Sequence, residues 1–136
     1  MILIIGVGND MRGDDAFGPL VIQELRRTGT QATLWSGGAP ENFIGKIREP
    51  VETLVILDTA YLGKEPGTVE IIDPDKIKGH VSTHKLPLSL LIKTLRPEKT
   101  YFIAAQPLSS SFGVEPSPEI LRAVERAKEI VLDLPV

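Results

Sequence analysis

The sequence predicts an α/β protein that forms one domain of 136 residues in three layers. Short apolar runs typical of buried strands alternate with amphipathic helical stretches along most of the chain. This alternation favours a mostly parallel, twisted sheet with helices on both faces. The five expected strands cover residues 2–5, 31–36, 53–57, 68–72 and 101–105. The four expected helices cover residues 14–27, 39–49, 86–95 and 118–133.

The first strand and helix are joined by a glycine-rich turn. The apolar, β-branched run at 2–5 is typical of a buried strand, and Gly6 and Gly8 allow a tight turn after it. The following helix has acidic residues at its start and Arg26-Arg27 at its end, which suits the helix macrodipole. Ligands of open α/β sheets bind at the carboxyl ends of strands, so this turn is a candidate site.

The middle of the chain supplies the second helix and two strands. Pro40 stands near the first position of this helix, and Pro50 ends it because the residue before a proline avoids the α region. The run 53–57 is the most strand-like segment and leads directly into Asp58. Only a loop separates it from the strand at 68–72. A parallel neighbour needs a longer crossover, so we expect that strand to pair antiparallel, near a sheet edge.

The last part of the chain combines irregular segments with two helices. Residues 75–85 are irregular and contain both histidines, and the helix at 86–95 ends before Pro97. A proline- and serine-rich loop at 106–117 follows the last strand, and long ordered loops are often functional. The strongly amphipathic helix at 118–133 closes the fold.

Composition excludes several kinds of site. The net charge of −3 and the few aromatic residues make nucleic acid an unexpected partner. The absence of cysteine removes disulfides, thiolate nucleophiles and cysteine-ligated metals, so a metal would need carboxylates, the two histidines or backbone oxygens. No signal peptide pattern is visible, and no stretch approaches the about 20 apolar residues of a membrane helix. We therefore expect a cytoplasmic protein that does not enter the membrane.

The paired glycines at Gly6 and Gly8 are similar to the start of a dinucleotide-binding fingerprint. The third glycine of that fingerprint would fall at Met11, and no Gly-Lys-Ser/Thr of a phosphate-binding loop follows. A tight strand-to-helix turn is the better interpretation, so no organic cofactor is expected.

Three aspartates are candidate site residues at the carboxyl edge of the predicted sheet. Asp14 and Asp15 open the first helix, and we expect one of them to cap it by accepting a hydrogen bond from an orphan N–H group. Asp58 follows a buried strand, where a carboxylate needs hydrogen bonds or a nearby cation; a turn-forming role is an equal alternative. If the first and third strands are parallel, the three acids project from one edge, which favours a site.

The two histidines and one loop complete the candidate residues. His80 and His84 are four residues apart, but the residues between them are not helix-like, so the spacing does not support a ligand pair. His84 directly precedes a helix and is a candidate ligand or general base, with an exposed histidine of no special role as the alternative. Gln106-Pro107 ends the last strand at the same edge, where we expect a loop that contacts the substrate.

Taken together, these motifs resemble the hydrogenase maturation endopeptidases, which process the large subunits of NiFe hydrogenases. The resemblance runs in order through residues 6–18, 54–58, 83–84 and 106–107 and covers most of the chain. The segments 36–42 (SGGAPEN) and 84–88 (HKLPL) are most similar to the branch that serves hydrogenase-3-type enzymes.

Two positions depart from the pattern of other branches of this family. Many relatives have Gly-Gly-Thr where this chain has Gly-Gly-Ala-Pro, and many have glycine where this chain has Ala16. Neither departure falls on a residue of the family's metal-binding trio, which the resemblance carries over to Asp15, Asp58 and His84. Asp14 is then left as the structural cap.

The resemblance implies a hydrolase with a phosphorylase/hydrolase-like fold, of aspartic type by family. Its expected reaction is removal of the C-terminal extension of the NiFe-hydrogenase large-subunit precursor after nickel insertion. The nickel is expected to be that of the substrate's active site, and the protein is expected to act as a monomer.

Two other classes of function stay open. One is a hydrolase of similar fold that acts on a different protein, as the germination proteases do. The other is a non-enzymatic module that binds nickel or a maturation partner. Incubation with the precursor discriminates among the three, because only a maturation protease shortens its C-terminus.

Overall fold

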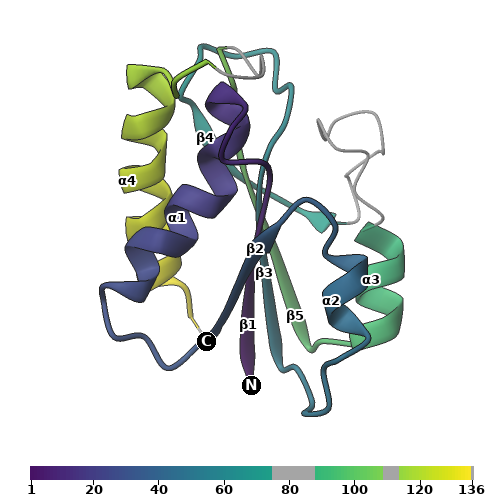
Figure 1. Cartoon of the computed structure of the whole chain (residues 1–136). Helices are drawn as coiled ribbons and strands as arrows, with labels where there is room; N and C mark the ends of the chain where they lie inside the picture. The colour runs from purple at the N-terminus through teal and green to yellow at the C-terminus, as the bar shows by residue number, and fades with distance from the viewer. Residues whose placement is uncertain (75–87, 109–113, 136) are drawn as a thin grey trace.

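The computed structural model describes residues 1–74, 88–108 and 114–135, which form a sheet between two layers of helices (Figure 1). The strands are β1 (Ile2–Val7), β2 (Thr33–Gly37), β3 (Thr53–Thr59), β4 (Val69–Ile72) and β5 (Lys99–Ala105). The helices are the 3-10 helix η1 (Gly13–Ala16) and the α-helices α1 (Phe17–Arg26), α2 (Glu41–Ile44), α3 (Leu88–Leu95) and α4 (Pro118–Asp133). This arrangement confirms the predicted α/β class.

The sheet has the strand order β2-β1-β3-β5-β4. The first four strands in this order are parallel, with Leu3 beside Leu54 and Ile56 beside Phe102. β4 is an edge strand and pairs antiparallel with β5, which follows it in the chain. The predicted edge position and antiparallel pairing of β4 are confirmed, but its partner is β5 and not the preceding strand β3, on which the loop-length argument rested.

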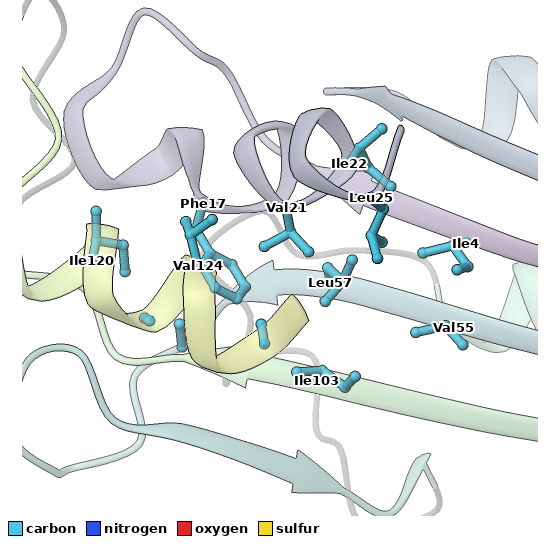
Figure 2. Close-up of a cluster of buried hydrophobic side chains, with 13 residues drawn as sticks. Ile4, Phe17, Val21, Ile22, Leu25, Val55, Leu57, Ile103, Ile120 and Val124 are labelled. Atoms are coloured by element: carbon cyan, nitrogen blue, oxygen red, sulfur yellow. The ribbon is translucent and has the colours of Figure 1, made fainter. Parts of the chain in front are cut away.

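Each face of the sheet has its own apolar core. Helices α1 and α4 cover one face and α2 and α3 the other (Figure 1). We call the core beneath α1 and α4 the first core and the core beneath α2 and α3 the second. Side chains alternate along a strand, so Val55 and Leu57 of β3 enter the first core, whereas Leu54 and Ile56 enter the second. The labelled side chains of the first core point toward one another from both helices and three strands, as Figure 2 shows.

Two helices differ from the sequence-based expectation. The first begins as the 3-10 helix η1 and becomes an α-helix only at Phe17. The second is predicted to extend to residue 49, before Pro50, but it ends at Ile44 and is followed by Gly45. Glycine is a poor helix former because it loses more backbone entropy than other residues. The N–H groups of Lys46 and Ile47 then bond carbonyls three residues earlier.

A close glycine contact seats α1 on β1. A Cβ atom on Gly6 would lie 2.3 Å from the carbonyl oxygen of Gly18, and one on Gly18 would lie 2.5 Å from that of Val7. Gly8 has a φ of 151°, and a Cβ there would lie 2.0 Å from the carbonyl oxygen of Asp15. The glycines therefore form the predicted tight turn and bring η1 down against the end of β1.

Candidate functional site

The candidate acids meet at the carboxyl edge of the sheet. Asp14 and Asp15 lie in η1, which packs against β3, and Asp58 lies near the carboxyl end of β3. β1 and β3 are adjacent and parallel, so both elements deliver their acids to the same edge, as the sequence predicts.

Asp58 is completely buried, with 0% of its surface exposed. It is the last but one residue of β3 and stands beside Ala104 of β5, so the alternative of a turn-forming aspartate is wrong. Its Oδ1 accepts a hydrogen bond from the backbone N–H of Thr59 at 2.8 Å. Alternation along β3 puts Asp58 on the α2 and α3 face with Ile56. Burial of this carboxylate costs desolvation free energy that hydrogen bonds or a nearby cation must offset, and this keeps Asp58 a candidate site residue.

Asp15 is 6% exposed and is joined to the glycine turn. The backbone N–H of Asn9 lies 3.2 Å from both the side-chain Oδ2 and the carbonyl oxygen of Asp15. The carboxylate is therefore oriented by the turn that follows β1.

Asp14 is 1% exposed, and its described hydrogen bonds go to the connection between β5 and α4. Its Oδ2 accepts from the backbone N–H of Leu108 at 2.6 Å and from the hydroxyl of Ser117 at 2.9 Å. Its Oδ1 accepts from the backbone N–H of Ser117 at 2.7 Å. The expected capping of the first helix is wrong, because η1 begins after Arg12 and α1 after Ala16, neither with a side-chain cap.

Ser117 is a buried residue that sequence reasoning missed. Its hydroxyl oxygen accepts from the backbone N–H of Ile120 at 3.1 Å and so caps α4, which has Pro118 in its first turn. Ser-Pro at a helix start is a recognisable capping signal. The bond to Asp14, 103 residues away, has no local signal in the sequence.

Gln106 fixes the loop that follows β3. Its side-chain Oε1 accepts from the N–H of Leu62 at 2.6 Å, and its backbone bonds Gly67 and Thr68. These bonds give Gln106 a structural role at the edge. The expectation that Gln106-Pro107 also contacts the substrate stays a prediction.

A cleft of about 250 Å³ opens between the loops after β1 and β2, and Asn9, whose N–H bonds Asp15, is part of its wall. It is lined by residues 8–10, Pro19 and residues 36–38. Glycine backbone and small side chains form most of its wall.

The histidines His80 and His84 lie outside the described residues. Within the ranges that the structure covers, no three histidine, cysteine, aspartate or glutamate side chains are grouped so that they could hold a metal ion. The trio of Asp15, Asp58 and His84 therefore stays a prediction that depends on His84. In the same ranges, no helix is long and apolar enough to cross a membrane.

The mostly parallel sheet, with helices on both faces and buried acids at its carboxyl edge, defines an open α/β protein with a candidate site at the ends of its strands. A family model for hydrogenase maturation protease matches residues 19–134. The hydrogenase 3 maturation protease of Escherichia coli K12 is 37% identical over 130 residues, which cover 90% of this chain and 83% of that protein. A putative hydrogenase maturation protease of Methanocaldococcus jannaschii is 34% identical over 70% of this chain and 63% of its own length.

Solved structures agree with these matches. The crystal structure of the NiFe hydrogenase maturation protease HycI from Thermococcus kodakarensis superposes with a TM-score of 0.82 at 37% identity, covering 96% of this chain and 88% of that one. The solution structure of the endopeptidase HycI from E. coli gives a TM-score of 0.82 at 34% identity, covering 95% and 88%. The chain belongs to the hydrogenase maturation protease family, which confirms the resemblance seen in its motifs.

Proposed function

We propose that this protein is an endopeptidase that removes the C-terminal extension of a NiFe-hydrogenase large-subunit precursor after nickel insertion. The proposal includes action as a monomer in the cytoplasm, as expected from the sequence. The observation that carries it is the pair of buried carboxylates, Asp15 and Asp58, at the carboxyl edge of a maturation protease fold. The match to a hydrogenase 3 maturation protease over 90% of the chain supports a hydrogenase-3-type precursor as substrate.

The donor set of the predicted trio fits a nickel centre carried by the substrate. Two carboxylates and an imidazole are acceptable ligands for nickel and leave coordination positions for groups of the substrate. Nickel held there would supply Lewis-acid polarisation of the scissile carbonyl, as the alternative to activation of water by a carboxylate. Asp15 comes from η1 and Asp58 from β3. Because both belong to regular secondary structure, their carboxylates are held in fixed places.

In the other alternative, the carboxylates provide proton transfer. In the proposed reaction, Asp15 or Asp58 accepts a proton from the attacking water and later supplies one to the leaving amine. The Asn9 N–H orients Asp15 and the Thr59 N–H orients Asp58, so neither carboxylate has to reorganise during the reaction. The neighbouring cleft receives the extended segment of the precursor.

The direct test is incubation of the full chain with the purified, nickel-loaded precursor, followed by mass spectrometry of both proteins. The expected result is one shortened precursor with a defined loss at its C-terminus. A precursor of unchanged mass that still forms a complex would indicate the non-enzymatic binding module instead. Cleavage of an unrelated protein with no cleavage of the precursor would indicate a different hydrolase.

Nickel recognition is tested separately by comparing the nickel-loaded and nickel-free precursors. We expect cleavage to wait for the loaded metal centre, so the nickel-free precursor should stay intact. Equal rates on both precursors would overturn nickel recognition while leaving the endopeptidase activity in place. An Asp15→Asn or His84→Ala protein that processes at the normal rate would remove that residue from the trio.

A further inference from the structure

β2 is an edge strand, and among the described residues its one strand partner is β1. The N–H of Gly8 donates to the carbonyl of Gly37 at 3.0 Å, so the backbone of Gly37 is directed toward β1. Backbone direction alternates along a strand, so Trp35 also bonds β1, whereas Leu34 and Ser36 direct their N–H and C=O groups away from it. We call these outward groups of Leu34 and Ser36 the open side of β2.

The side chains of β2 anchor the strand and leave its backbone on the open side. Leu34 packs against the first core and Trp35 against the second. The Trp35 ring stacks on Phe43 with ring centroids 5.3 Å apart. Gly37 leaves space for this ring, because a Cβ there would lie 2.9 Å from it. The strand is therefore held from both faces of the sheet, and a partner would meet backbone groups that are already in place.

The two edge strands of the sheet differ in their protection against another strand. Edge strands are commonly short or carry charged residues that discourage pairing. β4 has four residues, and its Glu70 forms an ion pair with Lys64. β2 has the sequence Thr-Leu-Trp-Ser-Gly, with no charged residue and no proline. The open side of β2 is therefore suited to pairing with an extended polypeptide.

The open side of β2 leads into the cleft between the loops after β1 and β2. Ser36 and Gly37 belong both to β2 and to the wall of this cleft. Asn9 stands in the same wall, and its N–H donates to Asp15 at 3.2 Å. A strand paired with β2 would therefore have one end at a cleft whose wall is bonded to a candidate acid.

We propose that the open side of β2 binds the C-terminal segment of the precursor as an added strand of the sheet. Its N–H and C=O groups, in strand spacing, are complementary to the backbone of an extended chain, which is the chemistry of strand addition. The continuity of β2 with the cleft favours the substrate over a second copy of this chain. The inference rests on the proposed function, since that function supplies the polypeptide.

Amide hydrogen exchange of the full chain, alone and with the nickel-loaded precursor, tests the pairing directly. The amides of Leu34 and Ser36 should exchange about tenfold or more slowly in the complex, while that of Ile71 in β4 stays unchanged. Unchanged exchange at Leu34 and Ser36 in the complex would overturn the proposal. Slowing that needs only a higher concentration of this chain would assign the open side to a second copy, and would overturn it as well.

Ser36→Pro removes one outward N–H and no bond to β1, a change that edge strands tolerate. Ile71→Pro is the matched control on β4. There the Gln106 N–H donates to the Thr68 carbonyl, so alternation puts the Ile71 N–H on the side away from β5. The KM for the nickel-loaded precursor should rise roughly tenfold or more in Ser36→Pro, because a carbonyl of the precursor loses its donor. It should stay within about twofold in Ile71→Pro, and an equal KM in the two variants would contradict the pairing.

Leu34→Pro provides a second variant if Ser36→Pro does not fold, and Leu34→Ala, which keeps the N–H, is measured beside it. The KM should be roughly fivefold or more higher in the proline variant than in the alanine variant. Equal values would count against strand addition. Cleavage of the precursor without slower exchange on the open side of β2 would overturn the pairing alone. Slower exchange without cleavage would overturn the proposed activity alone.

Discussion

The carboxyl edge of the sheet and the core beneath α1 and α4 are stabilised in different ways. In the core, apolar side chains such as Leu57 and Val124 pack without a specific partner (Figure 2). At the edge, each buried aspartate accepts hydrogen bonds from particular backbone groups. Leu57 and Asp58 are adjacent in β3, and both are fully buried. Burial alone therefore does not distinguish a residue that stabilises the fold from a residue of the candidate site. In this pair the distinction lies in the chemistry of the buried group, which is apolar in Leu57 and a carboxylate in Asp58.

The sharpest way to test this difference is Asp58→Asn. We expect kcat/KM for the nickel-loaded precursor to fall roughly 100-fold or more, because an amide does not accept a proton as a carboxylate does. The fold should persist, since the amide oxygen can still accept from the Thr59 N–H. Single-turnover processing and a thermal unfolding curve measure the two effects. Normal processing by this variant would show that Asp58 belongs with the structural residues.

The opposite result is expected at the neighbouring position. Leu57→Ala leaves a cavity between β3 and the helices α1 and α4, and it should lower the free energy of unfolding by about 2–5 kcal/mol. Urea denaturation measures this loss. At a temperature where the variant is folded, processing should be little changed. Strong loss of activity in a folded Leu57→Ala protein would mean that the core and the edge are not separable.

The glycine contact between β1 and α1 connects the two regions. Gly18→Ala puts a Cβ against the backbone of Val7, which cannot move like a side chain, so we expect a loss of about 1–3 kcal/mol, as in other overpacked cores. Gly45→Ala is the matched control, because nothing lies within 4 Å of a Cβ there and φ is −63°. That change should be neutral or stabilising by about 0.4–1 kcal/mol. Equal stabilities by urea denaturation would show that the contact is not tight.

The same difference explains what could be predicted from the sequence. The strands follow from their short apolar runs, and strand geometry then puts Val55 and Leu57 on the opposite face from Leu54 and Ile56, so a sheet with a core on each face was predictable. The convergence of the acids followed from parallel pairing of β1 and β3.

The partners of the buried acids could not be read from the sequence in the same way. Asp14 looked like a helix cap because capping is local, but its donors come from Leu108 and Ser117, far along the chain. The early end of α2 has a local cause at Gly45, whereas the predicted end rested on Pro50. Periodicity and turn residues therefore predict the frame, whereas hydrogen bonds between distant loops depend on the finished fold.

The smallest expected effect on stability comes from an exposed ion pair on α4, which belongs neither to the apolar core nor to the carboxyl edge of the sheet. There Lys128 donates to Glu125 at 2.9 Å, which lowers the pKa of the Glu125 carboxyl and raises the pKa of the Lys128 ammonium. The stabilisation from Glu125 is present above its unfolded pKa and is lost as the pH falls through the lowered value. That from Lys128 is lost only as the pH rises through its raised value.

Glu125→Gln should therefore be slightly less stable than wild type at neutral pH, and the difference should shrink as the pH falls below the ordinary range of a glutamate. Salt should shrink it as well, because exposed ion pairs are screened. Glu129→Gln, which alters the more widely spaced pair with Arg126 at 3.5 Å, is the control. Thermal unfolding across pH measures both. A difference that persists in acid would show that Glu125 stabilises α4 through packing of its side chain, as the core residues do, and not through its charge.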